Sequence, residues 1–316
     1  MSVDIALVGC GRLAEAGYLP ALAEVPEIRL VAVADPDAAR RDHVARLAIA
    51  NGHPVTAHAD LGEVLAGTTV DAVVLASPAA AHPAGAAEAV TAGVPLLVEK
   101  PPAPDATGAA AIARLDPAPW VGFNRRFDPG VHALRHLVPP RGHVQLDLVI
   151  HYRRRSWRPI TVDDDVLTDL APHAVDLARW LTAGEVIEVV GATCTTARAE
   201  LHLMLTRARA RVSLATDRPH RELVEVRDDR GAVVGRHALG GLAAAVRGRL
   251  RQAPGPPALV AALAGQLRAL GDTVRGAPAP DLGTAADGLA VMDVIDAIRI
   301  CAARGGRPTA VARTEL

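Results

Sequence analysis

The chain of 316 residues begins with an apolar run that leads directly into a glycine-containing turn. Val3 to Val8 is short and almost wholly apolar, which is typical of a buried parallel strand. Gly9-Cys10-Gly11-Arg12-Leu13-Ala14 follows, and an alanine- and leucine-rich stretch to about Ala23 predicts a helix. In such a strand–loop–helix the first glycine permits the tight turn and the second lets the backbone approach a pyrophosphate at the helix N-terminus. Taken alone, this fingerprint is weak.

An acid after the next strand strengthens the prediction of a dinucleotide-binding site. A strand predicted over 29–34 ends at Asp35, about 20 residues beyond the loop, where a carboxylate binds the ribose hydroxyls of a dinucleotide. Because that carboxylate would repel a 2′-phosphate, we expect NAD in preference to NADP. Arg40 and Arg41 would soften the preference if either reached back, but a solvated helix face is the more common role. The pattern assigns these residues to the cofactor: Gly9, Gly11, Arg12, Leu13 and Asp35.

Strands and helices continue to alternate as far as residue 122. Helices are predicted over 38–51, 61–66 and 82–92, and strands over 55–57, 70–76, 94–98 and 120–122. Repeated strand and helix of this kind predicts a doubly wound parallel sheet. In such sheets ligands bind outside the carboxyl ends of the strands.

Lys100 lies at one of these ends and is the only lysine in a chain that has 34 lysines and arginines together. Arginine serves equally well on a surface but cannot place a compact ammonium against a substrate oxygen or shift its pKa into a working range. Lys100 is therefore the first candidate for chemistry, although one lysine is also what a biased composition would leave. Ser77-Pro78 and His82 follow the neighbouring strand, and for His82 local bonding at a helix start is as probable as contact with cofactor.

The pattern changes from about residue 123. A helix is predicted over 129–137, and polar and apolar residues alternate over 143–152, as in a half-buried antiparallel strand. Further strands are predicted over 186–195, 201–206, 210–215, 222–227 and 232–237, and helices over 259–274 and 284–303.

Between these strands, Asp169 and His173 are four residues apart. In a helix this spacing puts both on one face; if Pro172 begins the helix, where proline fits better than in an interior, they flank its start. A carboxylate near an imidazole steadies its protonated form, as a general acid or base requires. The alternative is a capping aspartate and an ordinary interfacial histidine.

Composition and net charge argue against several kinds of binding partner and indicate where the protein is located. A net charge of −1 gives no reason to expect nucleic acid or an anionic membrane as partner. No apolar run reaches the length of a membrane span and no signal sequence is evident, so we expect a cytoplasmic protein. Cys10, Cys194 and Cys301 are widely spaced, which favours reduced thiols over a disulfide framework and predicts no metal site.

Together the ordered motifs resemble the Gfo/Idh/MocA family of NAD(P)-dependent oxidoreductases. They are the glycine loop, Asp35, Ser77-Pro78…His82, Glu99-Lys100-Pro101, Gly122 to Phe127, and Asp169…His173…Asp176. The resemblance implies a Rossmann domain over 1–122 and an α+β domain over 123–316 with a large, open, mostly antiparallel sheet. It implies that this sheet joins subunits into a homodimer or homotetramer, and that the helix over about 284–303 packs back on the Rossmann domain.

The same resemblance implies roles for individual residues. The family's catalytic lysine, aspartate and histidine map onto Lys100, Asp169 and His173, with a cis peptide before the proline after the lysine. The resemblance adds Ser77, Pro78, His82, Glu99 and Lys100 to the residues expected to bind the cofactor. Weaker candidates for substrate contact are Asn124, Arg125 and Asp165. The chain departs from the family where Asp163-Asp164-Asp165 replaces a glycine run and Ala171 replaces a glycine. These acids favour an amino-bearing substrate, or else form a solvated loop in which Asp165 caps a helix.

The expected activity is hydride transfer between NAD and a secondary alcohol or ketone of a sugar, deoxysugar or cyclitol. Two alternatives stay open: reduction of another C=O or C=N intermediate, and a non-catalytic NAD-binding sensor or regulator. A sensor would need none of Lys100, Asp169 and His173.

Overall fold

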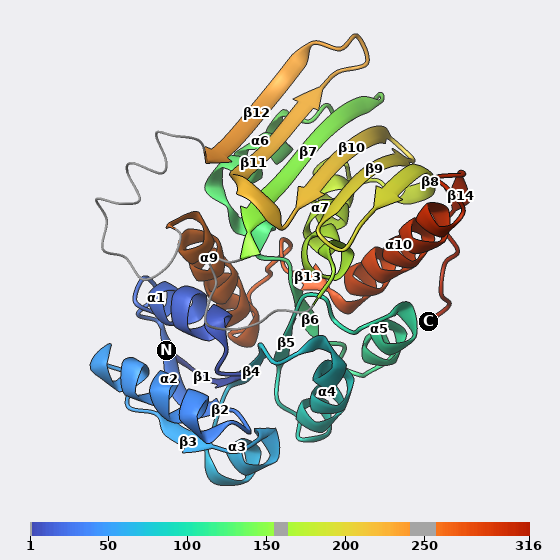
Figure 1. Cartoon of the computed structure of the whole chain (residues 1–316). Helices are drawn as coiled ribbons and strands as arrows, with labels where there is room; N and C mark the ends of the chain where they lie inside the picture. The colour runs from blue at the N-terminus through green and yellow to red at the C-terminus, as the bar shows by residue number, and fades with distance from the viewer. Residues whose placement is uncertain (1, 155–163, 241–256) are drawn as a thin grey trace. The chain divides into compact units, whose positions relative to one another are not determined.

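A computed structural model describes residues 2–154, 164–240 and 257–316 (Figure 1). The chain divides into two compact units. Unit 1 comprises residues 1–128, 253–289 and 316, and unit 2 comprises residues 129–252 and 290–315. Helix α10, Ala285–Ala303, therefore begins in unit 1 and continues in unit 2.

Unit 1 is built on a mainly parallel sheet, sheet A, in which seven strands are found among the described residues. In chain order the strands are β1 Val3–Val8, β2 Ile28–Ala34, β3 Thr56–His58, β4 Ala72–Leu75, β5 Leu96–Glu99, β6 Trp120–Gly122 and β13 Gly283–Thr284. Their order in space is β13-β6-β5-β4-β1-β2-β3, and β13 alone of these pairs antiparallel. The order reverses at β1 and β4, so the predicted doubly wound sheet is confirmed.

The helices of unit 1 follow the predicted alternation with two differences. They are η1 Ala14–Tyr18, α1 Leu19–Leu22, α2 Ala38–Ala50, α3 Leu61–Gly67, η2 Ala79–Ala81, α4 His82–Thr91, α5 Ala106–Ala113, η3 Asn124–Phe127 and α9 Pro257–Val274. The first helix opens with a π-helical turn, η1, and not with a regular α-helix. Helix α5 was not predicted, because prolines crowd the preceding loop; Asp105 starts it by accepting a bond from the Gly108 N–H at 2.8 Å. None of the helices in the described ranges is long and apolar enough to cross a bilayer.

Helix α9 completes the core of unit 1, although it lies far along the chain. It packs on η1 and α1, and a Cβ added at Gly17 would lie 2.7 Å from Leu263 Cδ1. Leu263 and Leu267 are fully buried in one cluster with Tyr18 and Leu22. The absence of a side chain at Gly17 thus allows α9 to lie directly on the helix that follows the glycine loop.

Unit 2 contains sheet B, open and mostly antiparallel as expected (Figure 1). Its described strands are β7 Val144–Arg153, β8 Val186–Cys194, β9 Arg198–Leu205, β10 Ala208–Ala215, β11 Asp217–Arg227, β12 Val233–Gly240 and β14 Thr309–Ala310. The spatial order is β12-β11-β7-β10-β9-β8-β14, and among these pairs β7 and β10 run parallel. Helix α6, Pro129–Leu137, contacts β12, and helix α7, Val166–Thr182, packs on β7, β9 and β10.

Helix α7 begins six residues before the proline that we expected in its first turn. Asp165 is its N-cap and accepts a bond from the Thr168 N–H at 2.7 Å, while Pro172 lies inside the helix. The expectation for Pro172 was wrong because burial of the helix outweighs the one backbone hydrogen bond that proline removes. Residues 170–182 are all buried.

Gly9 offers a direct test of how tightly the first loop is fitted to sheet A. Its φ is +106°, and an added Cβ would lie 2.5 Å from the carbonyl carbon of Ala76. Gly52 also has a positive φ, +88°, but an added Cβ there meets nothing within 4 Å. We expect Gly52→Ala to lower the free energy of unfolding by about 1–2 kcal/mol from backbone strain alone. Gly9→Ala should lower the free energy of unfolding, measured with denaturant, by at least twice that amount. Equal decreases for the two variants would show that the loop around Gly9 can shift to accommodate a side chain.

Candidate active site

The glycine loop fits between the ends of β1 and β4. Gly9 lies against the backbone of Ala76 and Ser77, whereas the space beside Gly11 is open to 4 Å. The Cys10 N–H donates to Asp35 Oδ2 at 2.8 Å. Arg12 pairs with Glu15 at 3.0 Å, and Leu13 packs against the core of unit 1. The loop is thus fixed by its contacts with β4 and Asp35 and leaves space at Gly11, as binding of a dinucleotide pyrophosphate requires.

Asp35 lies at the end of β2, as predicted, and is 7% exposed. Its second oxygen, Oδ1, accepts a bond from the Asp37 N–H at 2.8 Å. Arg41 Nη1 donates to the Asp35 carbonyl oxygen at 2.9 Å, whereas Arg40 pairs with Asp37 at 3.4 Å. Arg41 therefore reaches back to the position of the acid, and the solvated-face interpretation holds only for Arg40.

The loops after β4 and β5 are joined by His82. The imidazole is 1% exposed, with Nε2 2.8 Å from the Ser77 carbonyl oxygen and Nδ1 3.1 Å from that of Pro101. Burial lowers the pKa of His82, and the backbone hydrogen bonds act in the opposite direction. The bond to Ser77 is local, as in the first of the two roles considered for this histidine, whereas the bond to Pro101 connects it to the loop after β5. Pro78, beside Ser77, is exposed. Contact of Ser77, Pro78 and His82 with cofactor stays a prediction.

Glu99 and Lys100 stand at the end of β5, and the Lys100–Pro101 peptide is cis, as the resemblance implied. Glu99 is 3% exposed; its Oε1 accepts a bond from the Tyr18 hydroxyl at 2.5 Å and its Oε2 one from the Lys100 N–H at 3.1 Å. Gln266 Nε2 donates to the Tyr18 hydroxyl at 3.2 Å. Burial raises the pKa of Glu99, and the Tyr18 hydrogen bond opposes this rise. No local sequence pattern indicated Tyr18 or Gln266, because only the fold brings η1 and α9 to this strand.

In unit 2, Asp169 and His173 lie one turn apart on α7, on the same face of the helix. His173 is 8% exposed. Asp169 Oδ2 accepts hydrogen bonds from the Tyr152 hydroxyl and, at 3.2 Å, from Arg154 Nη2. Burial and the charge of Asp169 raise the pKa of Tyr152. Tyr152 and Arg154 were not predicted, since their nearness to α7 follows from the packing of β7.

The three weaker substrate candidates take different positions. Asn124 is 6% exposed and Arg125 is half-buried, both in η3 of unit 1. Asp165 caps α7, which is the structural alternative given for it, and Asp164 is exposed. Asp163 lies outside the described residues. The capping role of Asp165 therefore gives no support to recognition of an amino group by this residue.

The predicted site residues thus form two groups. Unit 1 brings the glycine loop, Asp35, Ser77, His82 and Lys100 to the carboxyl edge of sheet A, and unit 2 places Asp169 and His173 on α7. Within the ranges 2–154, 164–240 and 257–316, no cluster of three histidine, cysteine or acidic side chains has the arrangement of a metal site.

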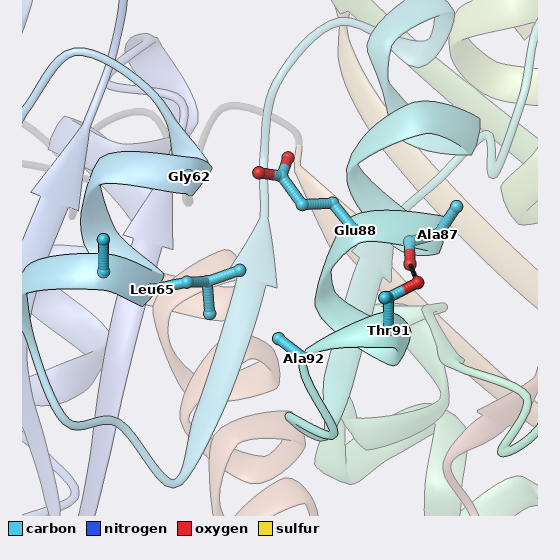
Figure 2. A pocket seen from close by; sticks show the side chains of 7 residues that line it. Gly62, Leu65, Ala87, Glu88, Thr91 and Ala92 are labelled. Carbon is cyan, nitrogen blue, oxygen red and sulfur yellow. Dashed lines mark hydrogen bonds between the residues drawn. The ribbon is translucent and has the colours of Figure 1, made fainter.

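A shallow groove lies elsewhere on unit 1, between α3 and α4 (Figure 2). Leu65 and Thr91 line it, and Glu88 points across it toward Gly62. On this side its lining is Ala87, Glu88 and Thr91 of α4 and the C-cap Ala92, at the end of the helix that is far from the carboxyl edge of the sheet. None of the predicted site residues lines this groove.

The two tyrosines of the chain, Tyr18 and Tyr152, provide a pH test of both groups. Each has a raised pKa in the folded protein, caused first by burial and then by a neighbouring carboxylate. Below a pH of about 10 the folded and unfolded states are both protonated; above it only the unfolded state ionises, so stability falls as pH rises further. We expect the ultraviolet absorbance of tyrosinate to appear together with loss of the far-ultraviolet circular dichroism. Tyrosinate forming with a midpoint near 10 in folded protein would contradict the two networks.

Comparison with known proteins agrees with this geometry. Residues 3–116 match the model of the "Oxidoreductase family, NAD-binding Rossmann fold". The chain is 36% identical to the myo-inositol dehydrogenase Hyg17 of Streptomyces leeuwenhoekii over 200 residues, 60% of this chain and 58% of that protein. It is 30% identical to inositol 2-dehydrogenase 2 of Saccharopolyspora erythraea, also over 200 residues, 61% of this chain and 58% of that protein. The matches therefore span less than two thirds of these relatives.

A solved structure shows that the likeness in fold extends over the whole chain. The myo-inositol dehydrogenase of Lactobacillus casei, solved in complex with NAD(H) and myo-inositol, superposes with a TM-score of 0.76 at 18% identity. The superposition covers 100% of this chain and 98% of that one. The resemblance inferred from the motifs is confirmed over residues 3–116, which match the NAD-binding Rossmann-fold model of the Gfo/Idh/MocA oxidoreductases.

Proposed function

We propose that this protein is an NAD-dependent dehydrogenase that transfers a hydride between nicotinamide and a secondary alcohol or ketone of a cyclitol or related sugar. The observation that supports this most is the position of Lys100, the single lysine, at the carboxyl end of β5 in the same unit as a glycine loop and acid that fit NAD. Cyclitol is the preferred substrate class because the relatives described above are inositol dehydrogenases.

Each part of the proposed site has one task. NAD, when bound, accepts the hydride of the alcohol carbon or returns it to a ketone. The open backbone at Gly11 binds the pyrophosphate and Asp35 the adenosine ribose. Lys100 polarises the oxygen of the reacting carbon through its ammonium group. His173 takes the hydroxyl proton in oxidation and supplies it in reduction, and Asp169 orients the imidazole.

The partners of Asp169 support its role as a fixed negative charge. Asp169 accepts a hydrogen bond from the Tyr152 hydroxyl and forms an ion pair with the Arg154 guanidinium at 3.2 Å. Tyr152 and Arg154 lie at the end of β7, so the sheet holds the carboxylate from one side while α7 positions it from the other. An anion held in this way favours the protonated form of a neighbouring imidazole.

We propose further that NAD is preferred over NADP. Asp35 supports this choice, because its carboxylate would lie against the 2′-phosphate of NADP. Arg41 sets a limit on the preference, since its guanidinium bonds to the carbonyl oxygen of the same residue. Some activity with NADP is therefore expected.

Assembly and location complete the proposal. We propose a homodimer or homotetramer formed through sheet B, which sedimentation would measure. On β9 and β10, alternate side chains such as Glu200, His202, Arg209 and Arg211 are exposed while those between them are buried, so one face of these strands is open. We place the enzyme in the cytoplasm, which agrees with Cys10, Cys194 and Cys301 being free thiols.

The activity is tested by steady-state assays of purified full-length protein with NAD(H) and NADP(H) on polyols, keto-sugars, amino-sugars and an imine. We expect turnover of a cyclitol or sugar alcohol, with kcat/KM at least about tenfold higher for NAD than for NADP, a difference of about 1.4 kcal/mol. Turnover confined to the imine would identify a C=N reductase. Tight NAD binding with no turnover of any compound would identify a sensor.

Lys100→Met tests the proposed role of the lysine. Loss of the ammonium should lower kcat by about 10²–10³-fold, as for other groups that stabilise a developing oxyanion, and leave NAD affinity nearly unchanged. Arg46→Met, which removes an exposed cation from α2, is the matched control and should retain full activity. Binding is measured by isothermal titration and turnover by NADH absorbance. Normal activity of Lys100→Met would remove the mechanism.

A further inference from the structure

The network behind Lys100 places three polar side chains in the core of unit 1. Glu99 is 3% exposed, and Tyr18 and Gln266 are fully buried. A buried carboxylate is unfavourable for folding unless it is well bonded, and an apolar side chain of the same volume would be at least as stable there. Stability alone therefore does not account for Glu99, Tyr18 and Gln266.

The chemistry of the groups fixes the direction of each hydrogen bond. The Gln266 amide donates to the Tyr18 hydroxyl, and the hydroxyl donates to Glu99 Oε1, because an ionised carboxylate only accepts. The other oxygen of the same carboxylate accepts the Lys100 N–H. A continuous chain of hydrogen bonds thus runs from α9 to the backbone of the single lysine.

The packing around the network leaves little freedom. A Cβ added at Gly122, on the neighbouring strand β6, would lie 2.9 Å from Glu99 Cδ and Oε1. On the other side, Tyr18 ends the π-helical turn η1, and Gly17 beside it is in contact with α9. Such π-helical turns are rare and occur frequently at functional sites. Strand β6, η1 and α9 therefore confine the carboxylate to one position.

We propose that Tyr18, Glu99 and Gln266 are positioning residues for Lys100, and that Gln266 makes the geometry of the Lys100 loop depend on α9. Glu99 holds the Lys100 peptide through its N–H and places a negative charge next to the residue whose ammonium meets the substrate. The catalytic consequence rests on the proposed function; the structural coupling does not. Burial raises the pKa of Glu99, and the Tyr18 hydrogen bond and the Lys100 charge partly offset this rise.

The single lysine makes the coupling directly observable. Full-length protein labelled only with ¹⁵N-lysine gives one backbone amide signal, that of Lys100. An amide that donates to a carboxylate is shifted downfield, so Glu99→Gln should move this signal upfield. Tyr18→Phe and Gln266→Leu should also move it, although neither residue touches the Lys100 amide.

Gln145→Leu, which alters an exposed glutamine on β7, is the matched control and should leave the signal in place. An unmoved signal in folded Tyr18→Phe and Gln266→Leu, with folding checked by circular dichroism, would overturn the proposal. If one of these variants does not fold, the other decides the question by itself.

Kinetics separate positioning from general support of the fold. Tyr18→Phe and Gln266→Leu should lower kcat by about tenfold and leave KM for NAD within about twofold of the wild type, because they act on Lys100 and not on the nucleotide loop. A rise in KM for NAD with kcat unchanged would contradict the proposal. If wild-type protein turns over no compound, the proposed function fails, while the amide signal still tests the coupling.

Discussion

The hydrogen bond between the Tyr18 hydroxyl and the Glu99 carboxylate connects segments that are far apart in the sequence. Tyr18 belongs to the helix after the glycine loop, Glu99 to the fifth strand, and Gln266 joins them from α9. A carboxylate with 3% exposure is stable only with such partners. The glycine loop, the end of β5 and α9 are therefore parts of one structure, and the single lysine is attached to it.

A second acid, partly buried, has a comparable part in unit 2. Asp169 accepts hydrogen bonds from Tyr152 of β7 and from Arg154, the residue after that strand, and it lies one helical turn from His173. In both units a carboxylate fixed by a tyrosine stands beside the residue for which we propose chemistry. Under this proposal the acids themselves transfer no proton; they fix charge and orientation, which is the main contribution of a protein to hydride transfer with a nucleotide cofactor.

Patterns local in the sequence predicted the fold and the position of most site residues. Apolar runs and glycines indicated sheet A, and the strand before Lys100 placed this residue at the carboxyl edge. The features that local patterns did not predict are those that depend on tertiary packing. Gln266 is 166 positions from Lys100, and Tyr152 faces Asp169 only because α7 packs on β7. Pro172 is inside α7 because burial outweighs its helix-breaking tendency, and the prolines before α5 concealed a helix that Asp105 caps.

Under the proposed mechanism, Lys100 and His173 act on one oxygen of the substrate. A crystal structure of the protein with NAD and the cyclitol on which it is most active tests this most directly. We expect Lys100 Nζ and the His173 imidazole both to lie within hydrogen-bond distance of the hydroxyl on the carbon that faces nicotinamide C4. A complex in which that hydroxyl is bound by neither residue would contradict it.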